Sequence, residues 1–330
     1  MFITNSAFIF AIDQDEISPY KYTERPIPSY KIPVSSRFTA NRAESDAPAI
    51  VYYLTKPTQD SYPIAILCGG STTKGDLDSI IHFHRYLLKE LNDLGLGVLT
   101  VEQWGIDGNS INENEFMTHY TRSQRLDDHQ VIIEHLKLNS PHGWNGKLVF
   151  LGVSEGGPIV TSLTELYSDI TLATINWVGA GDWTWREELW AFICDMRKRG
   201  PWYLKLWDLM PRWLPFSLDV PKTRNQYDIC MNQILANPDV DQEFMGMTYL
   251  YHADALQYPA HDYAKIKTPF LSVIGSEDPM IESGDAFAQK AKAVGVKITY
   301  LRVDGMDHYI RRRPDIIEQS FEWLKQILNS

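Results

Sequence analysis

Apolar residues along this chain form two kinds of pattern that alternate. Residues 64–67, 97–101 and 148–152 are short, mostly apolar runs, which are typical of strands buried on both faces. Over residues 80–94 and 125–138, apolar side chains instead recur every three or four positions, which predicts amphipathic helices. This alternating order predicts an α/β fold with a mostly parallel, doubly wound sheet.

The alternation continues through a strand predicted at residues 172–178 and then stops. It returns with strands predicted at 270–274 and 297–303. Pro314, followed by an acidic residue, marks the start of a last helix, because proline suits the first helical position.

The interval between these two parts is rich in tryptophan. Its tryptophans are Trp183, Trp185, Trp190, Trp202, Trp207 and Trp213. We therefore predict a core domain formed by residues 1–181 and 266–330, interrupted by a helical, Trp-rich lid insertion at residues 182–265.

The N-terminal part adds two predicted β-like runs, at residues 31–37 and 50–54. Residues 1–12 are apolar in places but lack the basic segment and the small-residue cleavage site of a signal peptide. We therefore expect a buried strand there.

Charge and composition exclude several classes of protein. The net charge of −11 argues against nucleic acid as a partner, because phosphate binding needs clustered Lys and Arg. The short basic run at residues 311–313 is interpreted as a solvated face. No stretch approaches the roughly 20 apolar residues that cross a bilayer, so no transmembrane segment is expected. Three cysteines, Cys68, Cys194 and Cys230, make no disulfide framework, which favours a cytoplasmic location.

The strongest chemical signal is a Gly-x-Ser-x-Gly motif at residues 152–156, with Ser154 at its centre. It follows a predicted buried strand and opens a predicted helix, which is the setting of a serine nucleophile on a tight strand-to-helix turn. Glycines on either side of the serine avoid clashes with the adjoining strand and helix. An idle serine in a glycine-rich turn is the alternative interpretation.

A serine nucleophile needs a general base and an acid that orients the base. His308 follows the last predicted strand, at the same sheet edge as Ser154, because parallel strands end together. Asp278 follows the strand at 270–274, and the order Ser, Asp, His is the one expected of this arrangement. Three other acids are alternatives for this position: Asp182, Glu277 and Asp307.

Backbone N–H groups must also stabilise the oxyanion of the reaction. One donor is expected from Glu155, the residue after the serine. The second is expected from the glycine-rich turn after the strand at 64–67, with Gly70 preferred and Ser71 second. A plain tight turn would need the same glycines.

Together these motifs resemble the α/β-hydrolase superfamily over residues 30–330. Residues 67–71 take the place of the family's oxyanion turn, residues 103–110 resemble its glycine-rich loop, and the Ser-Glu-Gly-Gly elbow is similar to bacterial esterases and serine-peptidase-like members. The sequence departs from the pattern at Cys68, where histidine is usual, and at residues 102–104, where Asp and Arg are usual. The resemblance implies an α/β-hydrolase fold and a triad of Ser154, His308 and Asp278, without a metal or organic cofactor.

The insertion occupies the place of the lid that such enzymes carry. Trp183 and Trp185, together with Trp104 and Ser71, are candidate substrate contacts. Packing of the lid onto the core explains the tryptophans at least as well. Glu187 and Glu188, which are adjacent in the same segment, have two interpretations. They either hold a substrate amine, as in aminopeptidase-like relatives, or are solvated charges on a helix.

We therefore expect a serine hydrolase that cleaves a carboxylic ester or thioester of a small apolar or aromatic substrate. The alternatives are an aminopeptidase-like amide hydrolase with the same triad and a non-catalytic binding protein on the same scaffold. The expected partner is a small-molecule substrate, and the expected state is a monomer or a homodimer.

Overall fold

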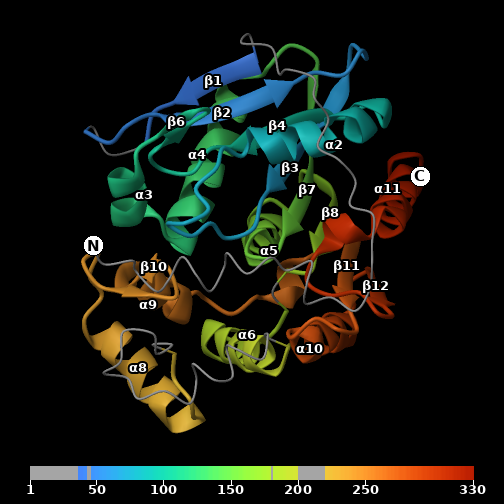
Figure 1. The fold of residues 1–330 in the computed structure, drawn as a ribbon. Helices are drawn as coiled ribbons and strands as arrows, with labels where there is room; N and C mark the ends of the chain where they lie inside the picture. Colours follow the sequence, from blue (N-terminus) through green and yellow to red (C-terminus); the bar gives the residue numbers. More distant parts are fainter. Residues whose placement is uncertain (1–35, 43–45, 180, 200–219) are drawn as a thin grey trace.

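The computed structural model describes residues 36–42, 46–179, 181–199 and 220–330 (Figure 1). The strand expected at residues 1–12 and most of the β-like run at 31–37 lie outside these residues, as do three of the lid tryptophans: Trp202, Trp207 and Trp213.

An eight-stranded sheet forms the centre of the described structure, in the order β1-β2-β4-β3-β7-β8-β11-β12. The strands are β1 (Arg37–Ala40), β2 (Ile50–Thr55), β3 (Tyr62–Cys68), β4 (Gly97–Val101), β7 (Trp144–Val153), β8 (Thr171–Trp177), β11 (Phe270–Gly275) and β12 (Ile298–Val303). From β4 to β12 all neighbours are parallel, whereas β1 and β2 pair antiparallel at one edge. The expected mostly parallel sheet is confirmed.

Helices cover both faces of this sheet because its strands alternate their apolar side chains between two clusters. Ala65 and Leu67 of β3 pack with α2 (Ile81–Asp93) and α11 (Pro314–Leu328) on one face. Their strand neighbours Ile64 and Ile66 pack with α4 (Arg122–Asn139) and α5 (Gly156–Leu166) on the other. Beside β11, α10 (Ile281–Ala293) packs through Phe287. The two-faced arrangement is that of a doubly wound sheet.

A group of helices leaves the sheet between β8 and β11 and lies at one end of it (Figure 1). It contains α6 (Trp185–Arg199), α8 (Arg224–Ala236), α9 (Tyr249–Gln257), the short hairpin of β9 (Glu243–Phe244) and β10 (Met247–Thr248), and the 3₁₀ turn η3 (Tyr263–Lys265). Leu189, Ile193, Tyr227 and Met231 form its own apolar cluster. The division into a core and a lid at residues 182 and 265 stays a prediction.

A second, smaller connection joins β4 to α4 and packs against that helical group. It comprises β5 (Ile106–Asp107), β6 (Ser110–Ile111) and α3 (Glu113–His119). Phe116 and Tyr120 share one apolar cluster with Met247 and Tyr251 of the helical group. This contact ties the helical group to the loops beside the sheet.

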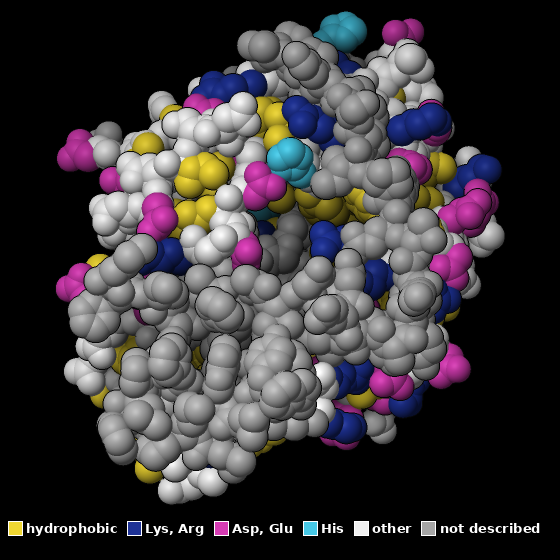
Figure 2. Space-filling model, viewed as in Figure 1, with side chains coloured by type: hydrophobic (Ala, Val, Ile, Leu, Met, Phe, Trp, Pro, Cys, Tyr) yellow, Lys and Arg dark blue, Asp and Glu magenta, His cyan; other side chains and the backbone are white. Residues whose placement is uncertain are grey.

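None of the helices within the described ranges is long and apolar enough to cross a bilayer. On the face seen in Figure 2, the described acidic side chains are interspersed with Lys and Arg.

Buried Glu102, one of the departures from the family pattern, organises the loops around α2. Its carboxylate accepts hydrogen bonds from the Ile80 N–H at 3.1 Å and the Gly108 N–H at 3.2 Å. The hydroxyls of Tyr53 and Ser79 donate to it as well. One buried side chain therefore satisfies four donors from three separate segments.

Replacing this carboxylate is expected to destabilise the fold. Glu102→Ala should lower the free energy of unfolding by about 3 kcal/mol, because buried donors lose their acceptor. Urea unfolding followed by circular dichroism measures the change. Glu134→Ala, which removes an exposed carboxylate paired with Lys137, should change stability by less than about 0.5 kcal/mol. Equal losses of stability in the two variants would contradict the role of Glu102 in holding these loops.

Candidate active site

Ser154 occupies a sharp turn between β7 and α5. Its φ of 51° lies in the left-handed region, which a residue other than glycine rarely adopts. The neighbouring glycines leave no room for side chains. A Cβ on Gly152 would lie 2.3 Å from the Gly156 carbonyl oxygen, and one on Gly156 would lie 2.0 Å from the Cys68 carbonyl oxygen. The turn therefore needs small residues on both sides of the serine.

The structure brings Ser154, His308 and Asp278 together. The Ser154 hydroxyl lies 2.9 Å from His308 Nε2, and His308 Nδ1 lies 2.8 Å from an Asp278 carboxylate oxygen. The three residues follow the carboxyl ends of β7, β12 and β11. At Gly275, a Cβ would lie 1.8 Å from the Met306 carbonyl oxygen, so glycine lets the Asp278 and His308 loops approach closely.

The surroundings of His308 favour its charged form. Burial by itself lowers the pKa of His308, but the charge and hydrogen bond of Asp278 outweigh it, and the pKa lies above its ordinary value of 6.5. Asp278 is in turn held by the Met280 N–H, which donates to its second oxygen at 2.9 Å. The helix α10 begins three residues after Asp278, at Ile281.

The three rival acids have other partners in the structure. Asp182 accepts hydrogen bonds from the Tyr263 hydroxyl and from Lys290, each at 2.6 Å. Glu277 forms an ion pair with Arg199 at 3.3 Å. Asp307 forms one with Arg312 at 2.7 Å. Among the four carboxylates, Asp278 is the one that bonds the His308 ring.

The glycine-rich turn after β3 lies against the serine. A Cβ on Gly70 would lie 3.3 Å from Ser154 Cβ, whereas Ser71 is exposed. Within the described residues, the backbone N–H groups of Gly70, Ser71 and Glu155 donate to no protein acceptor. These N–H groups are therefore free to bind a ligand oxygen.

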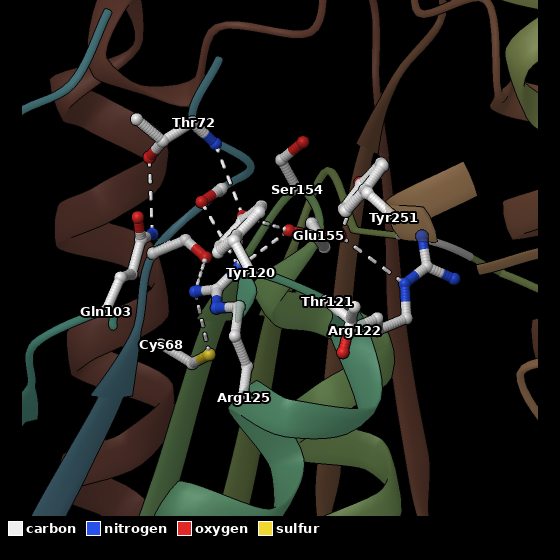
Figure 3. A network of polar contacts seen from close by, with 12 residues as sticks. Cys68, Thr72, Gln103, Tyr120, Thr121, Arg122, Arg125, Ser154, Glu155 and Tyr251 are labelled. Atoms are coloured by element: carbon white, nitrogen blue, oxygen red, sulfur yellow. Dashed lines mark hydrogen bonds and ion pairs between the residues drawn. The ribbon is translucent and has the colours of Figure 1, made fainter. Parts of the chain in front are cut away.

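The side chain of Glu155 has a role that the sequence reading missed. Its carboxylate is 2 % exposed and accepts hydrogen bonds from Tyr120 at 2.6 Å, Tyr251 at 2.5 Å and Arg125 at 2.7 Å. Burial alone would raise the pKa of Glu155, but Arg125, Arg122 and the two tyrosines outweigh it and lower this pKa. In Figure 3, the Ser154 hydroxyl points away from this network. The available sequence signal was Arg125 at the start of the helix predicted over 125–138, with Arg122 three positions before it.

The rings of two candidate substrate-binding tryptophans, Trp104 and Trp185, are in contact with other side chains of the protein. Trp104 is buried between Arg42, 3.9 Å from its ring, and His119, which stacks on it at 4.0 Å. Trp185 donates from its indole N–H to His252 and packs on the Tyr251 ring. These contacts pack both indole rings against neighbouring side chains. Trp183 is partly buried, and its backbone N–H donates to Ser283.

Glu187 and Glu188 face different surroundings on α6. Glu187 is half-exposed and pairs with Arg224 at 3.1 Å. Glu188 is 1 % exposed and lies near the triad, where its charge acts on the His308 imidazole. Burial raises the pKa of Glu188 to about 7, although the Arg122 charge opposes this.

In the described part of the chain, no group of three or more His, Cys, Asp or Glu side chains is arranged to hold a metal ion.

Comparisons with solved structures show similar folds. Est1E from Butyrivibrio proteoclasticus, with ferulic acid bound, is 18% identical with a TM-score of 0.55, covering 88% of this chain and 100% of that one. A thermostable carboxyl esterase from Bacillus coagulans is 15% identical with a TM-score of 0.58, covering 89% and 97%. BpoC from Mycobacterium tuberculosis, described as a non-heme bromoperoxidase, is 13% identical with a TM-score of 0.53, covering 87% and 99%. At these identities the likeness shows the fold alone.

A search of the curated proteins finds no match to this chain. A family model described as serine aminopeptidase, S33, matches residues 75–312, which is more than half of the chain. With the eight-stranded sheet and its structural neighbours, this match identifies the fold as that of an α/β-hydrolase. The chain therefore belongs to the serine aminopeptidase S33 family of hydrolases.

Proposed function

We propose that this chain is a serine hydrolase that cleaves a carboxylic ester or thioester of a small apolar or aromatic substrate. The observation that carries the proposal is the continuous hydrogen-bond chain from Asp278 through His308 to Ser154. Serine alone is a poor nucleophile, and this order of groups is the one that activates it.

The reaction proceeds in two steps. His308 Nε2 takes the Ser154 proton as the oxygen attacks the substrate carbonyl, and the proton then passes to the leaving oxygen or sulfur. Water, activated by the same imidazole, releases the acid and restores the serine. Asp278 holds the imidazole orientation and stabilises its positive charge, while the Gly70 and Glu155 N–H groups bind the oxyanion.

Two observations support an ester with an apolar or aromatic acyl part. The rings of Phe192 and His308 meet edge to face, with centroids 5.0 Å apart, so an aromatic lid side chain borders the base. Est1E, whose fold this chain shares, was solved with ferulic acid, an aromatic acid, in complex. Trp183 and Trp185 remain candidate substrate contacts, with Trp185 also packing the lid.

Removing the nucleophile tests the proposal directly. Ser154→Ala should lower kcat for p-nitrophenyl butyrate by on the order of 10⁴ or more, because the covalent step is lost. Circular dichroism should show an unchanged fold. Activity of the folded variant at the wild-type level would rule the mechanism out.

The acid can be tested through the pH dependence of kcat/KM. His308 must be neutral to act as base, so activity falls as the pH drops through its raised pKa. Asp278→Asn should lower kcat by on the order of 10⁴ and shift this acid limb to lower pH, because the carboxylate that raises the pKa is gone. Asp182→Asn and Glu277→Gln are the matched controls. Both should leave kcat and the pH of the acid limb at their wild-type values. A loss confined to one of the controls would reassign the acid.

A second candidate, cleavage of amides with a free amine, is favoured by one observation. Glu188 is a buried carboxylate beside the triad, where it could pair with a substrate ammonium group. The name of the family, serine aminopeptidase, fits this reaction.

Glu188→Gln separates the two candidates. If the amine is recognised, kcat/KM for aminoacyl p-nitroanilides should fall by on the order of 10-fold or more, while ester hydrolysis changes by less than about threefold. Glu187→Gln, on the exposed side of the same helix, should affect neither substrate. Equal losses for both substrates would argue against an amine site.

A further inference from the structure

We propose that Arg125 is the positioning residue of the oxyanion hole, holding the peptides of the Gly69-Gly70-Ser71 turn so that their N–H groups face Ser154. The proposal rests on the proposed function, since it concerns the site that would stabilise the oxyanion. Arg125 touches no reacting atom in this scheme and acts through the backbone of the turn.

The guanidinium of Arg125 contacts the turn at several points. Its Nη2 donates to the Gly69 carbonyl at 2.8 Å and lies 3.4 Å from the Cys68 sulfur. Its Nη1 donates to the Gly70 carbonyl at 3.3 Å and to the Glu155 carboxylate at 2.7 Å. One planar group therefore joins the oxyanion turn to the residue that follows the nucleophile (Figure 3).

Peptide geometry turns these contacts into control of the donors. A trans peptide is planar, and its C=O and N–H point in opposite directions. The Gly69 carbonyl shares a peptide with the Gly70 N–H, and the Gly70 carbonyl shares one with the Ser71 N–H. Because Arg125 holds both carbonyls on the side of α4, both candidate donors are directed away from Arg125. Gly70 itself lies against Ser154.

Tyr120 fixes the far end of the same turn. Its hydroxyl accepts a hydrogen bond from the Thr72 N–H at 3.3 Å and donates to Glu155 at 2.6 Å. The turn is thus held at its carbonyls by Arg125 and at the Thr72 N–H by Tyr120. Arg125 and Tyr120 both donate to the Glu155 carboxylate. The backbone N–H of Glu155 is the other expected oxyanion donor.

Arg122 provides a matched contrast on the same helix. It is as buried as Arg125 and forms an ion pair with Glu155, with Nε 3.6 Å from the carboxylate. It packs on the rings of Trp185 and Tyr258 and bonds none of the turn carbonyls. Both arginines carry a positive charge next to Glu155, but only Arg125 bonds the turn. Comparing variants of the two arginines therefore separates the effect of the charge from the effect of holding the turn.

The test compares Arg125→Lys, Arg125→Met and Arg122→Met in the full chain with p-nitrophenyl butyrate. Arg125→Met should lower kcat by on the order of 10² with KM changed less than about threefold, because the oxyanion donors are misplaced. Arg125→Lys keeps the charge but cannot reach both carbonyls and Glu155, so an intermediate loss of about 10-fold is expected. Arg122→Met should keep kcat within about threefold of the wild type.

A transition-state analogue separates positioning from general damage. The affinity for a phenyl trifluoromethyl ketone, whose serine adduct carries an oxyanion, should fall in the Arg125 variants by the same factor as kcat/KM. The affinity for butyrate, a product without an oxyanion adduct, should stay unchanged. Wild-type kcat in the Arg125 variants, or equal losses in Arg122→Met, would overturn the proposal.

Hydrogen exchange keeps this test distinct from that of the proposed function. The Thr72 N–H, which donates to the Tyr120 hydroxyl, should exchange faster in Arg125→Lys than in the wild type or in Arg122→Met, whether or not the ester is cleaved. Unchanged exchange there would overturn the positioning role. A wild-type chain that cleaves no ester, but shows this faster exchange in the Lys variant, would instead count against the proposed function alone.

Discussion

The left-handed backbone of Ser154 is the constraint on which the rest of the site depends. A side chain at that φ of 51° persists only when its surroundings hold it, and here they do so from several directions. Gly152 and Gly156 make room for the turn, and the buried Glu155 carboxylate anchors it to α4 and α9. The hydroxyl is thereby presented to His308 at the carboxyl edge of the sheet.

The same anchoring links the nucleophile to the helical group beside it. Tyr251 of α9 bonds Glu155, and the Trp185 ring of α6 packs against Tyr251. Phe192, also on α6, meets the His308 ring. The segments expected to shape the substrate site are therefore in contact with the groups expected to react. Substitutions in the lid should change the positions of Ser154 and His308.

The fold and the meeting of Ser154, Asp278 and His308 could be predicted because strand order alone determines which loops share the carboxyl edge. The role of the Glu155 side chain could not, since a charge next to a nucleophile is ordinarily solvated and its partners come from distant helices. The surroundings of Trp104 could not be predicted either. It was a candidate substrate contact, but the sequence pattern gives no sign that Arg42 and His119 enclose its ring.

Covalent labelling of the full chain determines whether Ser154 is an activated nucleophile, as proposed. A fluorophosphonate reacts with serines whose hydroxyl is activated by a neighbouring base. Peptide mapping after labelling should place a single adduct on Ser154. An unlabelled chain, or an adduct on another residue with Ser154 unmodified, would contradict an activated Ser154.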